Sequence, residues 1–252
     1  MQPTFLPWIG YFAMIAEVDT FVFLDSVQFA KRSWQQRNRI KTPQGEEWLT
    51  VPIRNKGRRD QFIQDTLIDS DNQFAKKTIQ TLTTNYSKSP FFKTYSPQIF
   101  KIIYENRFSL CELNIALIRQ CAEYFGIEKS KFLRSSSLPR RSRGAGLLVS
   151  ICNTLGANHY LSAPGSRAYL SGTDVFEKAD IKLSYHEYEH PIYNQLYGNF
   201  LPYLCIVDLL FNEGDRSFDI IKSGVNRQVE YINKSPSFVE INGELVRDSV
   251  FL

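Results

Sequence analysis

The chain has 252 residues, of which 43% are hydrophobic and 22% charged, a composition typical of a folded domain and not of a disordered segment. The formal net charge of +4 suits a small anionic ligand but is too weak to indicate nucleic-acid binding. No apolar run reaches the roughly 20 residues that a membrane-spanning helix needs, and no secretory signal is visible, so we expect a cytoplasmic protein without membrane insertion.

The first 70 residues predict a helix, a buried strand and a hairpin. The helix is expected over 9–18, and the apolar run TFVFLD over 20–25 predicts a buried strand. The segments WQQRNRIK and EEWLTVPI are expected to pair, because Pro43 and Gly45 between them are typical turn residues.

The next part of the chain favours helices. We expect one over 71–84, capped by its first residue, another over 96–106 and a third over 109–126. Ser109 and Glu112 have the spacing of a capping box, which marks the start of the third helix.

In the remainder, strands and helices alternate, and the tail carries the hairpin signal Asn242-Gly243. Strands are expected at 131–136, 159–162 and 181–188, a helix at 147–155, and a helix or buried run at 204–214. This alternation predicts an α/β fold with a mostly parallel sheet flanked by helices and a C-terminal β-hairpin. We expect a single domain, with a main body of residues 1–69 and 127–252 and a helical insertion over 70–126.

The cysteines predict no redox or metal chemistry. The four positions, 111, 121, 152 and 205, lie far apart with no CxxC spacing, and three sit among apolar residues. We expect reduced thiols in the core.

The opening QPTFLPWIGYF is the first candidate site. Two prolines stiffen the loop, Gly10 permits a close backbone approach, and Trp8 and Tyr11 offer flat faces with polar tips. The exposed amides of a first helical turn would also suit an anion. The alternative is that both aromatic side chains pack onto the sheet.

The second candidate site follows the first strand, in LDSVQFAKRSWQQRNRIK. Its cations are interleaved with a tryptophan and would hold a phosphate or carboxylate, and on strand periodicity Arg37 and Arg39 share a face with Lys41. A solvated hairpin and a nucleic-acid surface are the alternatives. The expected binding residues are Gln28, Arg32, Trp34, Arg37, Asn38 and Arg39.

Two further clusters lie in the second half. Ser135 and Ser136 end a strand before a loop with three arginines, which suits an anion or a flexible basic loop. His190 lies among tyrosines and carboxylates in YHEYEHPIYNQ, where it would serve as a general base or as a structural histidine. Asp208, an acid within an apolar run, needs buried partners.

Together, QPTFLPWIGYF, FLDSVQFAKRSWQQRNRIK, EEWLTVPI, LGANHYLSAPGSRAYL, HPIYNQ and VDLLFNEG resemble the WbqC-like family over nearly the whole chain. Genes of that family lie in bacterial O-antigen and capsule clusters, and a glycine-transferase role has been suggested for one group. The resemblance implies transfer of an acyl or aminoacyl group to the nitrogen of a nucleotide-linked amino sugar. A more distant likeness links PTFLPWIGY and DSVQF to the nucleotidyltransferase superfamily, which includes pantothenate synthetase. Its HxGH motif is replaced here by Trp8-Ile9-Gly10-Tyr11, which argues against ATP activation at this turn.

The leading hypothesis is therefore a cytoplasmic transferase that forms an amide. His190 or Asp25 would accept the proton of the amine, and no cofactor is required in the protein, because the acyl donor would be a carrier-protein or coenzyme A thioester. The alternatives are a non-catalytic sugar-nucleotide binding protein and an ATP-dependent amide ligase. The expected binding residues outside the hairpin are Gln2, Trp8, Tyr11, Ser135, Ser136, Tyr193 and Gln195, and no metal site is expected.

Overall fold

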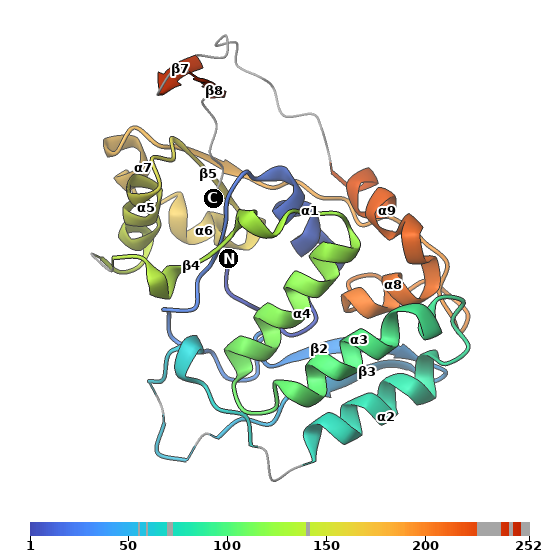
Figure 1. Ribbon diagram of the computed structural model, residues 1–252. Helices are drawn as coiled ribbons and strands as arrows, with labels where there is room; N and C mark the ends of the chain where they lie inside the picture. Colours follow the sequence, from blue (N-terminus) through green and yellow to red (C-terminus); the bar gives the residue numbers. More distant parts are fainter. Residues whose placement is uncertain are drawn as a thin grey trace.

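Helices and short strands alternate along the chain, so the fold class is α/β, as predicted (Figure 1). The computed structural model describes residues 1–54, 56–58, 60–69, 73–139 and 142–225, and the strands over 238–241 and 244–247.

The N-terminal part contains the predicted helix, strand and hairpin. Helix α1 (Ile9–Glu17) leads into strand β1 (Phe21–Phe23). Strands β2 (Arg37–Thr42) and β3 (Gly45–Thr50) pair antiparallel around the expected turn, where Gly45 adopts a φ of 109° that glycine tolerates best. A short 3-10 helix, η1 (Ile63–Asp65), follows.

Three long helices come next: α2 (Phe74–Tyr86), α3 (Phe92–Glu105) and α4 (Leu110–Tyr124). The capping box is confirmed, because the Ser109 Oγ accepts a hydrogen bond from the Glu112 backbone amide at 3.3 Å. The second helix begins earlier than the predicted residue 96, although Pro97 lies inside it, because its apolar face is buried throughout. Asp71, the expected N-cap of the helix predicted over 71–84, lies outside the described residues.

The second half carries short strands between short helices. Its strands are β4 (Phe132–Arg134), β5 (His159–Ser162) and β6 (Lys182–Tyr185), the last ending three residues before its predicted end. Its α-helices are α5 (Ala145–Thr154), α6 (Arg167–Leu170), α7 (Val175–Lys178), α8 (Ile206–Glu213) and α9 (Ser217–Ser223). Its 3-10 helices are η3 (Lys129–Lys131), η4 (Ser135–Ser137), η5 (Pro164–Ser166) and η6 (Gly214–Arg216).

The parallel pairing takes the form of two short ladders, β1 with β4 and β5 with β6. The backbones of β7 (Phe238–Ile241) and β8 (Glu244–Arg247) pair antiparallel, and the expected Asn242-Gly243 turn between them lies outside the described residues.

Strand β1 separates two hydrophobic clusters. Phe21 and Phe23 pack into the larger one, with α1, α4 and α8, whereas Val22 packs into the smaller one with α5 and α7. Side chains alternate across a strand, so this three-residue strand is buried on both faces, as its apolar sequence predicts. All four cysteines are buried free thiols whose pKa values are raised by burial.

The range predicted as an insertion, 70–126, contains α2, α3 and α4. Figure 1 shows these helices side by side, with α5, α6 and α7 on the opposite side of the molecule. The β2–β3 hairpin contacts the end of α2, where the Lys41 backbone amide donates to the Tyr86 hydroxyl at 2.9 Å. Their buried side chains belong to the same hydrophobic cluster as those of α1 and α8. The division into a body and an insertion stays a prediction.

Candidate functional site

A cleft of about 300 Å³ lies where the N-terminal loop meets the hairpin. Trp8 and Tyr11 of the loop and the first turn of α1 share it with Trp34, Asn38 and Arg39. The two segments that the sequence singled out separately therefore line one cavity. The complete lining is Met1, Thr4, Pro7, Trp8, Tyr11, Trp34, Asn38, Arg39 and Tyr203.

Two buried asparagines, Asn38 and Asn114, bind the backbone of the N-terminal loop beside the cleft. Asn38 Nδ2 donates to the carbonyl oxygens of Phe5 at 3.2 Å and Leu6 at 2.7 Å, and Asn114 Nδ2 donates to that of Pro3 at 3.1 Å. These bonds support a backbone in which Leu6 has a φ of 43°, a region that non-glycine residues rarely adopt. Asn38 is thus a brace of the loop as well as a lining residue.

The Trp8 ring lies over the start of α1, and Gly10 makes room for it. A methyl group at Gly10 would lie 2.2, 2.5 and 2.7 Å from three ring atoms of Trp8. Tyr11 is buried, and its hydroxyl donates to the Gln2 carbonyl oxygen at 3.1 Å. Tyr11 therefore packs in the core and also lines the cleft. Burial raises the pKa of Tyr11 well above its usual value, which keeps it a neutral hydrogen-bond donor.

Gly10→Ala is expected to expel the Trp8 ring from its place and to deform the cleft. Overpacking of this kind costs about 1–3 kcal/mol, partly offset by the better helix propensity of alanine. Near-ultraviolet circular dichroism and tryptophan emission should change while the far-ultraviolet spectrum stays the same. Gly165→Ala is the control, because a methyl group there meets no atom within 4 Å. Equal spectral changes in both variants would contradict this account.

His190 belongs to the aromatic wall beside the cleft and is half-buried. Its ring stacks on Trp8 with 6.0 Å between centroids and meets Tyr203 edge-on at 5.0 Å. Its Nδ1 lies 2.9 Å from the Pro191 carbonyl oxygen, which can only accept, so Nδ1 carries the proton. Nε2 then keeps its lone pair, and this buried atom has no hydrogen-bond partner in the described part of the chain. Burial also lowers the pKa of His190, which favours the neutral ring.

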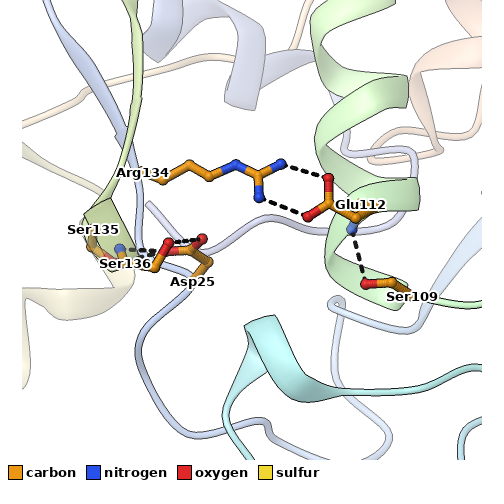
Figure 2. A network of polar contacts seen from close by, with 6 residues as sticks. All are labelled: Asp25, Ser109, Glu112, Arg134, Ser135 and Ser136. Atoms are coloured by element: carbon orange, nitrogen blue, oxygen red, sulfur yellow. Dashed lines mark hydrogen bonds and ion pairs between the residues drawn. The ribbon is translucent and has the colours of Figure 1, made fainter. Parts of the chain in front are cut away.

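Asp25, the other predicted base, is fully buried, and its carboxylate is hydrogen-bonded to Ser135 and Ser136. Its Oδ1 accepts from the Ser135 hydroxyl at 3.0 Å and the Ser136 amide at 2.9 Å, and its Oδ2 accepts from the Ser136 hydroxyl at 2.7 Å (Figure 2). Asp25 and the two serines do not line the cleft, and their contacts hold the end of β1 against η4.

Beside this cluster, Arg134 forms a two-bonded ion pair with Glu112 of α4, at 2.6 and 2.7 Å (Figure 2). Hydrogen bonding to Arg134 lowers the pKa of Glu112. The pair is partly exposed and joins the end of β4 to the start of the helix.

Tyr193 and Gln195, predicted to bind substrate, instead surround the buried carboxylate of Asp208. The Asp208 Oδ2 accepts from the Tyr193 hydroxyl at 2.9 Å and from Gln195 Nε2 at 2.8 Å, and its Oδ1 accepts from the Tyr86 hydroxyl at 2.8 Å. Lys41 is also buried here and donates to Gln195 Oε1 at 3.1 Å. This network anchors the segment that carries His190 and Tyr203 to α8 and the hairpin.

Three further predicted residues lie away from the cleft wall. Gln2 accepts from Gln35 and reaches the cleft only through its backbone bond with Tyr11. The exposed Gln28 donates to Asp60 at 3.1 Å, and Arg32 is exposed at a turn with a φ of 57°. None of the three lines the cavity. Arg37 lies just outside it, over the Trp48 ring.

The comparison with known families decides the assignment. Residues 2–220 match the model of the WbqC-like protein family. The chain belongs to this family. The WbqC-like chain is also 36% identical over 224 residues to an uncharacterized protein of Mycobacterium tuberculosis, Rv1507c, an alignment that covers 88% of the present chain and 96% of that protein. No solved structure matches it. Among the described helices, none combines the length and apolar character needed to cross a membrane.

Sequence reasoning missed two aromatic residues at the site of this WbqC-like protein. Tyr203, which lines the cleft, adopts a φ of 60° in a segment between two elements, and no periodicity signals its direction. Trp48 could have been predicted from the sequence, because counting residues from the predicted turn along both strands pairs Trp48 with Arg39.

Proposed function

We propose that this WbqC-like protein transfers an acyl or aminoacyl group to the amine of a nucleotide-linked amino sugar in surface polysaccharide biosynthesis, with glycyl as the first group to test. One observation carries the proposal. A cleft walled by aromatic rings and an arginine adjoins a neutral histidine whose Nε2 lone pair is unpaired. Rings suit a sugar or a base, the arginine suits a phosphate, and the lone pair suits a proton from an amine.

The reaction would be a direct aminolysis. The amine nitrogen of the sugar attacks the carbonyl carbon of a carrier-protein or coenzyme A thioester, a C–N bond forms and the C–S bond breaks. His190 Nε2 takes the proton of the amine and returns it to the departing thiolate. The step needs positioning and a base but no cysteine nucleophile, consistent with four buried thiols whose pKa values are raised.

Movement of one ring is part of this proposal. His190 Nε2 is buried in a ring cluster with Trp8, Tyr203, Tyr193 and Phe200. Trp8 and Tyr203 lie on the cleft side, so a substrate in the cleft must displace one of these two rings to reach it. Tyr203 is 49% exposed, which makes it the easier of the two to displace.

The test is product formation followed by mass spectrometry with a nucleotide-linked amino sugar and glycyl thioesters. His190→Asn should lower kcat by about 10²–10⁴ while KM changes little, because asparagine can still donate to the Pro191 carbonyl but has no lone pair in the place of Nε2. His159→Asn is the matched control, since that histidine lies on β5 and burial lowers its pKa as well, to about 4. The Cys152→Ala variant should retain full turnover.

Two results would replace this proposal. Binding of the sugar nucleotide without turnover for any thioester would favour a non-catalytic binding protein. Release of pyrophosphate from ATP with a requirement for magnesium would favour an ATP-dependent amide ligase.

A further inference from the structure

Two exposed tryptophans, one of which lines the cleft, lie together at its edge. The rings of Trp34 and Trp48 are 5.5 Å apart between centroids, with 35° between their planes, and the residues are 48% and 44% exposed. Large aromatic side chains are costly to expose, and a contiguous exposed pair next to a cavity is typical of a ligand surface. Trp34 also lines the cleft, so this surface continues into the cavity.

Two arginines of β2 complete the surface. The Arg37 guanidinium carbon lies 4.3 Å from the centre of the Trp48 ring, and that of Arg39 lies 5.6 Å from Trp34 and 5.9 Å from Trp48. We call these four residues, Trp34, Trp48, Arg37 and Arg39, the platform. Alternating aromatic faces and guanidinium groups can bind a base by stacking and a phosphate by charge-assisted hydrogen bonds.

The charges of the platform are only partly balanced. Arg39 Nη1 lies 3.0 and 2.7 Å from the two carboxylate oxygens of Glu46, whereas its Nε is buried without a partner among the described residues. Arg37 forms no ion pair in the described part of the chain. A phosphate would therefore meet the Arg39 guanidinium at Nη1, where Glu46 now binds, and would bring a larger negative charge to the two arginines.

We propose that the platform binds the nucleoside phosphate part of a substrate, and that Glu46 is an internal counter-ion which the phosphate displaces from Arg39. The base stacks on the indole rings, the phosphate contacts Arg37 and the Arg39 Nη1 that Glu46 releases, and the attached group extends into the cleft. One nucleotide supplies one base for the pair of indole rings and one phosphate group for the two arginines. The placement of the sugar rests on the proposed function, whereas nucleotide binding is tested without it.

The chain provides its own probe. It contains three tryptophans, Trp8, Trp34 and Trp48, and all lie in the cleft or on the platform. Titration with UDP should quench tryptophan emission, and calorimetry should give the Kd. Uridine and inorganic pyrophosphate should each bind at least about tenfold more weakly than UDP, because each offers only one half of the contacts. Arg37→Ala should weaken UDP binding by a similar factor.

Glu46→Gln is the decisive variant, with Glu47→Gln as its matched control. Both remove one negative charge, but the two side chains point to opposite faces of β3, and only Glu46 pairs with Arg39. UDP should bind severalfold more tightly to Glu46→Gln and with unchanged affinity to Glu47→Gln. Equal effects of the two substitutions, or pyrophosphate binding as tightly as UDP, would overturn the proposal.

The nucleoside phosphate could belong to the sugar nucleotide or to coenzyme A. Competition between UDP and coenzyme A, each tested with wild type and Arg37→Ala, separates the two sources, since the platform ligand is the one whose affinity depends on Arg37. Nucleotide binding without acyl transfer would support the proposal for the platform and contradict the proposed function. Acyl transfer with no measurable affinity for either nucleotide would support the proposed function and overturn the proposal for the platform.

Discussion

Replacement of Asp208 by asparagine is expected to lower the free energy of unfolding by about 3–5 kcal/mol at neutral pH, the range for breaking a buried charge network. The carboxylate accepts from Tyr86, Tyr193 and Gln195 and lies near the buried Lys41. An amide has one acceptor oxygen in place of two, so one donor loses its partner, and Lys41 loses its counter-charge.

The same variant is expected to remove a pH dependence of stability. Burial raises the pKa of Asp208 from 3.8 to about 6 in the folded protein, so the folded state binds this proton more tightly than the unfolded chain does. The resulting contribution to stability is complete below pH 4 and is lost as the pH rises through about 6. The difference between the two pKa values corresponds to about 3 kcal/mol.

Urea unfolding of wild type and Asp208→Asn between pH 4 and 7 is the measurement. The gap between the two free energies should be larger at pH 4 than at pH 7. Asp219→Asn is the control, because that carboxylate is exposed and forms a surface ion pair with Lys222. A gap that is independent of pH would contradict the raised pKa.

Asp25→Ala is expected to cost about 3 kcal/mol, whereas Glu112→Ala should cost no more than about 1 kcal/mol. Both carboxylates accept several hydrogen bonds (Figure 2). Asp25 is fully buried, so its removal takes an acceptor away from the Ser135 hydroxyl and from the Ser136 hydroxyl and amide, while Ser135 keeps its contacts with Ser26. Glu112 is half exposed, and water replaces it at Arg134.

Chemical denaturation of the two variants tests this contrast. Their far-ultraviolet spectra serve as the control for retained folding. Similar losses in both would mean that burial does not decide the strength of these contacts.

The elements with strong local signals were predictable from the sequence. The apolar run of β1, the turn between β2 and β3 and the cap at Ser109 depend on neighbouring residues, and the structure confirms all three. The N-terminal loop and the hairpin were each identifiable as candidate sites from their aromatic and polar residues, and the structure brings them together in one cleft.

The long-range polar contacts were not predictable. Strand alternation correctly placed Lys41 on the face of Arg37 and Arg39, but it gave no sign that the chain from residue 195 to 199 covers that end of the strand. Tyr193 and Gln195 have the chemistry of ligand-binding residues, and only the fold shows that Asp208 is their partner. Composition identifies which groups need partners, whereas the fold decides which partners they find.

The loop beneath the cleft has a thermodynamic consequence. Side-chain amides from the hairpin and from α4 already hold its carbonyl groups in the free protein. A ligand that enters the cavity therefore does not need to order this backbone, and association should occur with little loss of main-chain entropy. Variation of Thr4, a lining residue outside these contacts, offers a way to alter selectivity without disturbing the scaffold.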